Sequence, residues 1–219
     1  MTIRNLSALL SPGSVVLIGA SPQAGSVGEK IAGNLLGGGF AGKVYFVNPR
    51  HGEIAGHPCY PSIAALPETP VLGIVATPAK TVPGVISELG AKGTRAAVVV
   101  SAGMGANKQA MLDAARPYCL RILGPNGIGL ILPRLGLNAS FAHRDAPKGR
   151  IAFLSQSGAL LTTVIDWAAA RDIGFSHVVS LGDMADVDFG DLLDYFAGDT
   201  ESRAILIPME ALTDAAKFI

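Results

Sequence analysis

The chain has 219 residues, of which 49% are hydrophobic, and its 17 basic and 17 acidic residues give a net charge of zero. Because lysine and arginine form no run and no apolar stretch reaches membrane-spanning length, we expect neither nucleic acid nor a membrane as a partner. The N-terminus has no secretory signal pattern, which predicts a cytoplasmic protein, and the isolated Cys59 and Cys119 predict reduced thiols and no metal site.

The first clear pattern in the chain is a strand, a turn and a helix. Residues 15–18 are all apolar, as in a central parallel strand, and apolar residues then recur at four-residue spacing between 27 and 35. The glycines of the turn let the backbone approach a ligand, and the N-terminus of the helix favours a phosphate there. The spacing is neither G-x-G-x-x-G nor a P-loop, so the glycines serve either phosphate binding or only close packing of strand and helix.

The same alternation continues through the next hundred residues. It predicts strands at 44–47, 71–77, 96–101 and 121–123, and helices with apolar stripes at 82–89 and 111–115. Such alternation is typical of an α/β protein with a Rossmann-like, doubly wound parallel sheet. Small or polar residues follow each strand, and these ends form one crevice in which open α/β sheets bind ligands.

The end of the second strand separates several kinds of nucleotide ligand. An NAD enzyme has an acidic residue there, whereas this chain has Asn48-Pro49-Arg50. Arg50 suits a ribose that carries a phosphate, as in NADP or coenzyme A (CoA), or it is a solvated surface charge. No Tyr-x-x-x-Lys or similar hydride-transfer group occurs, which makes an NADP oxidoreductase a distant alternative.

A second series of elements follows a looser stretch that we expect to be a linker with some extended structure at 137–141. Strands are predicted at 151–154, 178–181 and 204–207, with helices marked by apolar residues at 161–168 and 192–196. The turn Ser155-Gln156-Ser157-Gly158 is either a second phosphate-binding helix N-terminus or an ordinary helix cap. The chain ends at Ile219 one turn into a further helical pattern, which suggests a fragment of a longer protein.

Several stretches together resemble the NDP-forming acyl-CoA synthetases, which are similar to the alpha subunit of succinyl-CoA synthetase. They are Gly19-Ala20-Ser21, Gly124-Pro125-Asn126-Gly127, residues 137–141, residues 153–159, Asp166-Trp167-Ala168, Gly174-Phe175-Ser176 and Ser180-Leu181-Gly182-Asp183. The resemblance implies a Rossmann-like CoA-binding domain over 1–133, a linker over 134–149 and a partial flavodoxin-like α/β domain over 150–219. Similar sequences form the N-terminal part of bacterial protein lysine acetyltransferases, and residues 34–40 and 191–195 are at least as close to that group.

The resemblance also assigns residues to two sites. For CoA it implies Gly19, Ala20, Ser21 and Pro22 at the phosphates, Pro49 and Arg50 at the nucleotide end, Thr77, Pro78, Ser101 and Ala102 along the pantetheine, and Asn126 near the thiol. For a phosphohistidine it implies the helix N-terminus Ser155, Gln156, Ser157 and Gly158, and the orienting carboxylate Glu210. The phosphohistidine itself would lie beyond Ile219, so the chain alone is expected to be inactive.

Two functions therefore remain open at this point. The first is the CoA-binding portion of an acid–thiol ligase that works through acyl phosphate and phosphohistidine, with ATP or ADP used only by the full-length protein. The alternative is a domain that binds CoA or acetyl-CoA and regulates a bacterial protein lysine acetyltransferase. The expected partners are CoA (or acyl-CoA) and either downstream ligase and nucleotide-grasp modules or an acetyltransferase domain, and a homo-oligomer is left open.

Two further expectations concern single residues. Gly19→Val should abolish CoA binding while the domain stays folded, because the added side chain would occupy the phosphate position. The four histidines should be surface or capping residues, and none should become phosphorylated in this chain.

Overall fold

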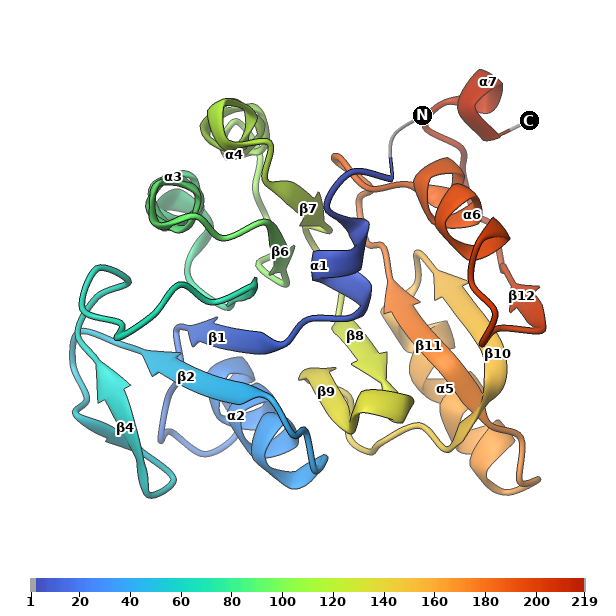
Figure 1. Cartoon of the computed structure of the whole chain (residues 1–219), viewed down its shortest axis with the longest axis horizontal. Coiled ribbons are helices and arrows are strands. Elements are labelled where there is room, and N and C mark those ends of the chain that lie inside the picture. Colours follow the sequence, from blue (N-terminus) through green and yellow to red (C-terminus); the bar gives the residue numbers. More distant parts are fainter. Residues whose placement is uncertain (1–2, 219) are drawn as a thin grey trace.

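The computed structural model describes residues 3–218, and its strands form two sheets that lie side by side (Figure 1). The first sheet has seven strands in the order β3-β4-β2-β1-β5-β6-β7. Their bounds are β1 Ser14–Ile18, β2 Lys43–Val47, β3 Glu53–Ile54, β4 His57–Tyr60, β5 Leu72–Val75, β6 Ala96–Val99 and β7 Arg121–Leu123. Neighbouring strands from β4 to β7 are parallel, and the edge strand β3 runs antiparallel to β4.

Helices cover both faces of this first sheet. They are α1 Leu6–Leu10, α2 Val27–Gly37, α3 Val82–Lys92 and α4 Asn107–Ala115, with short 3-10 turns at Ala79–Thr81 and Arg116–Tyr118. Val15 and Leu17 of β1 belong to a core cluster with α1 and α2, whereas Val16 belongs to a second cluster with α3 and α4. Alternate strand residues point to opposite faces, so a central strand with both faces covered needs an uninterrupted apolar run.

The second sheet has five strands in the order β12-β10-β11-β8-β9. Its strands are β8 Gly129–Leu132, β9 Leu137–Ser140, β10 Lys148–Ser155, β11 Phe175–Ser180 and β12 Ala204–Leu206. The helices of this unit are α5 Gly158–Ala169, α6 Phe189–Ala197 and α7 Ala215–Phe218, and a 3-10 turn spans Pro133–Leu135. Strands β12, β10 and β11 are parallel, and β8 pairs antiparallel with β11 and β9. Among residues 3–218, no helix combines the length and apolar character that crossing a membrane requires.

The predicted fold class is confirmed, but the region between the two sheets differs from expectation. Residues 134–149, predicted as a linker, contain β9, and all four residues of that strand are buried in the second sheet. Strand β8, which lies inside the predicted first domain, also pairs in the second sheet. The hairpin β8–β9 thus extends the second sheet, while the domain bounds 1–133 and 150–219 stay predictions.

A loop of the second unit runs along the end of β7 and joins the two sheets. The backbone N–H groups of Asp183, Ala185 and Val187 donate to the carbonyl oxygens of Pro125, Gly124 and Ile122 at 2.9, 2.9 and 3.1 Å. This pairing places the segment after β11 directly beside the segment after β7.

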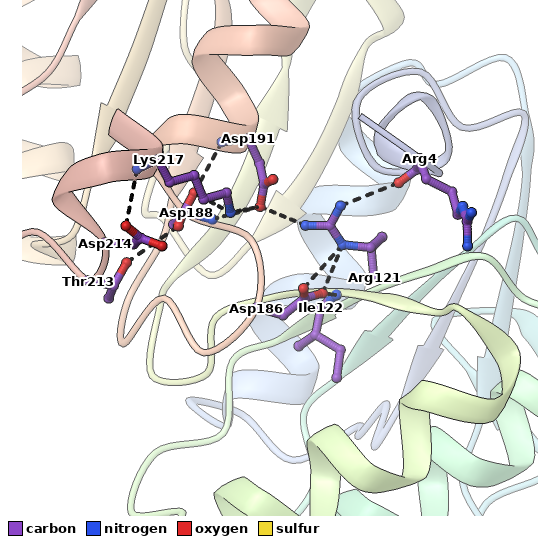
Figure 2. A network of polar contacts seen from close by, with 9 residues as sticks. All are labelled: Arg4, Arg121, Ile122, Asp186, Asp188, Asp191, Thr213, Asp214 and Lys217. Carbon is purple, nitrogen blue, oxygen red and sulfur yellow. Dashed lines mark hydrogen bonds and ion pairs between the residues drawn. The ribbon is translucent and has the colours of Figure 1, made fainter. Parts of the chain in front are cut away.

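Charged side chains reinforce the same junction (Figure 2). Arg121 of β7 is buried, and its guanidinium contacts Asp186 at 3.0 Å and Asp191 of α6 at 2.7 Å. Lys217 of α7 contacts the same Asp191 oxygen at 2.7 Å and Asp188 at 2.8 Å. Figure 2 shows these groups converging from the first sheet, from α6 and from the last described helix.

Candidate functional site

Two adjoining cavities lie at the carboxyl ends of the strands of the first sheet. The larger, of about 680 Å³, lies at the ends of β1, β2 and β5, and the smaller, of about 430 Å³, lies at the ends of β5, β6 and β7. Ala76 and Thr77 line both cavities, so the two lie next to each other along the ends of the strands. This is the crevice that the strand-end residues predict.

The structure brings most of the predicted CoA-site residues to this crevice. Gly19, Pro49, Arg50, Thr77 and Pro78 line the larger cavity, and Thr77, Ser101, Ala102 and Asn126 line the smaller one. Ala20, Ser21 and Pro22 line neither of the two cavities, and Ala20 is fully buried. The assignment of these residues to parts of CoA stays a prediction.

Several polar residues of the larger cavity were missing from the predicted set, among them Lys80 and Asn48. Lys80 lies in the 3-10 turn after β5 and lines the cavity together with Arg50, so two cations face this space, along with the carboxylate of Glu88. Asn48 lines it too, and its side chain donates to the carbonyl oxygen of Ala20 at 2.7 Å. Lys80 follows the predicted Thr77-Pro78 by two residues, which is the signal that could have identified it.

Gly19 is a structural requirement of the crevice. Its φ is +92°, and a Cβ at this position would overlap the backbone carbonyl of Ala76. A Cβ at Gly28 would in turn overlap the carbonyl oxygen of Gly19. The expectation that Gly19→Val leaves the domain folded is therefore wrong, because any side chain there strains the backbone and collides with the residue after β5 before a ligand is considered.

The N-terminus of α2 already carries two side-chain contacts. Ser26 caps the helix by accepting a hydrogen bond from the backbone N–H of Glu29 at 3.2 Å. The carboxylate of Glu29 accepts from the backbone N–H of Gly25 at 3.3 Å. An acidic side chain therefore occupies part of the turn in which a phosphate was predicted.

The smaller cavity combines apolar walls with a few oriented polar groups. Val27, Val100, Ile128 and Phe141 supply the apolar walls. The hydroxyl of Ser101 donates to the carbonyl oxygen of Thr77, and the buried hydroxyl of Thr77 has no hydrogen-bond partner among the described residues. Asn126 follows β7 in the left-handed conformation with φ +62°, and its side chain donates to Asp183 at 3.0 Å.

The second turn lies at the start of α5. Ser157 caps this helix by accepting from the N–H of Leu160 at 3.3 Å, as the simpler of its two interpretations predicts. The side-chain oxygen of Gln156 accepts from the backbone N–H groups of Glu210 and Ala211 at 2.9 and 3.0 Å. The predicted Glu210 segment is thus held beside the turn, although Glu210 itself is exposed.

The histidines do not all occupy the expected surface positions. His57 and His143 are exposed, but His177 is buried in β11, where its ring packs against Phe196. Burial lowers the pKa of His177 to about 4. The charge of Asp199 raises this pKa, and the charge of Arg134 lowers it. The expectation of a surface or capping role is therefore wrong for His177. Within residues 3–218, no cluster of three or more His, Cys, Asp or Glu side chains is arranged to hold a metal ion.

The fold and its two strand-to-helix turns define a class: a Rossmann-like α/β unit with a ligand crevice, joined to a flavodoxin-like α/β unit. The family described as a CoA binding domain matches residues 13–133, and the family described as a succinyl-CoA ligase like flavodoxin domain matches residues 148–219. The chain belongs to the CoA binding domain family, with the flavodoxin-like domain following it. This confirms the resemblance that the sequence motifs indicated.

Curated relatives and solved structures agree with this assignment. The chain is 44% identical to acetate–CoA ligase [ADP-forming] I of Archaeoglobus fulgidus, over 96% of this chain and 32% of the relative. It is 39% identical to the alpha subunit of acetate–CoA ligase [ADP-forming] I of Pyrococcus furiosus, over 98% of this chain and 49% of the subunit. A dinucleotide forming acetyl-coenzyme A synthetase 1 of Ca. Korarchaeum cryptofilum, solved with phosphate and ADP, superposes with a TM-score of 0.92 at 35% identity, covering 96% of this chain and 46% of that one. The chain therefore spans a third to a half of the relatives it matches.

Proposed function

We propose that this chain is the CoA-binding portion of an ADP-forming acid–CoA ligase, and that CoA lies along the two adjoining cavities. The observation that carries the proposal is the pair of adjoining cavities: Arg50 and Lys80 line the larger one, Asn126 lines the smaller one, and Thr77 lines both. CoA has an anionic nucleotide at one end and a long, weakly polar pantetheine arm at the other. The cationic larger cavity suits the nucleotide, and the apolar smaller cavity suits the arm.

The ligase reaction itself belongs to a longer protein than the residues described. An ADP-forming ligase converts a carboxylic acid, CoA and ATP into acyl-CoA, ADP and phosphate. In this chain the turn Ser155 to Gly158 would offer helix N–H groups to a phosphoryl group, and Glu210 would orient the phosphohistidine. ATP or ADP and the nucleotide-grasp module would act only in the full-length protein. The relatives from Archaeoglobus fulgidus and Pyrococcus furiosus are acetate–CoA ligases, which supports the ligase function. The alternative function is a regulatory role beside an acetyltransferase domain.

Titration calorimetry on the chain tests the proposed ligand. We expect heat of binding for CoA and none for NADP at the same concentrations. The double substitution Arg50→Gln with Lys80→Gln should weaken CoA binding by about tenfold or more, because each cation can make a charge-assisted hydrogen bond to a phosphate. The substitutions Lys148→Gln with Arg203→Gln remove the same two charges at exposed positions of the second unit and should leave the affinity unchanged. Equal binding of NADP and CoA would contradict the assignment.

A further inference from the structure

The side chain of Asn126 is held by a residue from the other unit of the molecule. Its Nδ2 donates to Oδ1 of Asp183 at 3.0 Å. Asn126 follows β7 of the first sheet, whereas Asp183 follows β11 of the second, so this hydrogen bond crosses from one sheet to the other. An ionised carboxylate only accepts hydrogen bonds, so the amide must turn its NH₂ group toward Asp183 and its oxygen away from it.

Neither backbone in this pair is free to shift. The N–H of Asn126 donates to the carbonyl oxygen of Ser101 at 3.1 Å, and the N–H of Asp183 donates to that of Pro125 at 2.9 Å. Gly182, with φ +56°, lies so close to Pro125 that a Cβ there would overlap its carbonyl oxygen. The contact between Asp183 and Asn126 is therefore built into the junction of the two sheets.

Asn126 is one of the residues that line the smaller cavity. Ala102, Ile128 and Phe141 line the same cavity without offering a polar side-chain atom, and the hydroxyls of Thr77 and Ser101 line it too. Asn126 and Asp183 are both exposed at the mouth of this space, so the amide of Asn126 is accessible to a ligand that enters the cavity.

We propose that Asp183 is a positioning residue, which fixes the amide of Asn126 so that its oxygen accepts a hydrogen bond from the pantetheine end of CoA. This rests on the proposed function. Two donors lie at that end of CoA, the thiol S–H and the N–H of the last amide, and both present a hydrogen to the same acceptor. Without Asp183 the side-chain amide of Asn126 can rotate and present its NH₂ group to the ligand. A hydrogen-bond donor of CoA cannot bind to that group, because both are donors.

Binding measurements with CoA and shortened analogues test the proposal. We expect Asp183→Ala to weaken CoA binding about three- to tenfold, the worth of one neutral hydrogen bond. Asp183→Asn should have a smaller effect, because an amide can still accept from Asn126. Adenosine 3′,5′-bisphosphate, which lacks the pantetheine arm, should bind all three proteins equally. Desulfo-CoA separates the two donors: if it binds wild type and Asp183→Ala equally, the donor is the thiol, and if it shows the same loss as CoA, the donor is the amide.

A double-mutant cycle with Asn126→Ala shows whether Asp183 acts through Asn126. In the Asn126→Ala background, Asp183→Ala should cause no further loss of CoA affinity, because the acceptor that it positions has gone. Asp145→Ala is the matched control, since Asp145 accepts from the amide of Asn138 at 2.6 Å in a similar pair that does not line the cavities. It should leave the affinity for CoA and for the bisphosphate unchanged.

Two kinds of result would overturn the positioning role while leaving the proposed function standing. One is an equal loss of affinity for CoA and adenosine 3′,5′-bisphosphate in Asp183→Ala, which would mean a general structural effect. The other is no loss for either ligand, or full additivity with Asn126→Ala. Failure of the wild-type chain to bind CoA at all would instead overturn the proposed function itself.

Discussion

His177 is a neutral histidine in the core of the second unit, and this makes stability depend on pH. Its pKa is lowered to about 4, whereas an unfolded histidine titrates near 6.5. Between these two pH values the unfolded chain binds a proton that the folded chain does not. The free energy of unfolding is therefore expected to fall as the pH drops from 6.5 to 4, by at most about 3 kcal/mol, and to lose this dependence above pH 6.5.

The charged groups near His177 do not change the sign of this prediction. Asp199 raises the pKa of the histidine and Arg134 lowers it, and burial is the largest cause. The pKa of Asp199 is itself lowered, because its burial is outweighed by hydrogen bonds from Ser202 and Glu201. Denaturant unfolding of His177→Gln should show a flatter profile between pH 4 and 6.5 than wild type, whereas His57→Gln, at an exposed site, should keep the wild-type slope. An unchanged slope in His177→Gln would rule out this residue as the cause.

At the scale of single elements, helix α2 combines a cap with a competing charge. The carboxylate of Glu29 accepts from the N–H of Gly25, next to the turn at which a CoA phosphate was predicted. Glu29→Gln should raise the affinity for CoA about two- to fivefold, because it removes a negative charge from that turn, and should lower stability by about 0.5 kcal/mol, because an acidic residue in the first turn stabilises a helix. Calorimetry and thermal unfolding measure the two opposite effects.

A matched substitution separates this effect from a general change of net charge. Glu201→Gln removes one negative charge in the second unit, where Glu201 pairs with Arg134 at the surface. It should leave CoA affinity unchanged. If Glu29→Gln weakens CoA binding instead, the carboxylate contacts the ligand rather than competing with it.

The elements differ in how well their sequences predicted them. Strand β1 was predicted almost to its bounds, because a strand buried on both faces leaves an unbroken apolar run. Strand β8 was missed, since its four residues follow closely on the first sheet, and only its pairing with the distant β11 assigns it to the second. Strand β4, which lies next to the edge strand β3, contains Pro58, and a proline in the sequence argues against a strand. Helix α1 has five residues and no side-chain cap, so its sequence carries little signal.

The residues of the candidate site also differ in how well the sequence predicted them. Residues at strand ends, such as Arg50 and Ser101, were predicted because the carboxyl ends of parallel strands converge at one edge of a sheet. Lys80 was missed because it lies within the 3-10 turn Ala79–Thr81 rather than at a strand end. The contact between Asn126 and Asp183 joins residues 57 positions apart, and no local pattern predicts such a pairing.

At the scale of the whole molecule, Arg121 connects the two sheets through a buried ion network. Its side chain is nearly inaccessible and contacts Asp186 and Asp191, the second of which is fully buried (Figure 2). One Asp191 oxygen has no hydrogen-bond partner among the described residues, so this carboxylate depends on the cations at its other oxygen. Removing one partner of a buried pair leaves an uncompensated charge, which typically costs about 3–5 kcal/mol.

We therefore expect Arg121→Gln to lower the free energy of unfolding by about 3 kcal/mol, at the lower end of that range because Lys217 still contacts Asp191. Arg116→Gln is the matched control: Arg116 pairs with Asp113 at 3.3 Å on the surface, where such pairs contribute at most about 1 kcal/mol. Because the network lies between the sheets, the loss should be seen equally by a probe in each unit, for instance by the fluorescence of Trp167 in α5 and of a label on Cys119 beside β7. Two separate unfolding transitions in the wild-type chain would show that the network does not couple the sheets. Equal losses of unfolding free energy in Arg121→Gln and Arg116→Gln would show that burial of the ion pair does not cause the effect of Arg121.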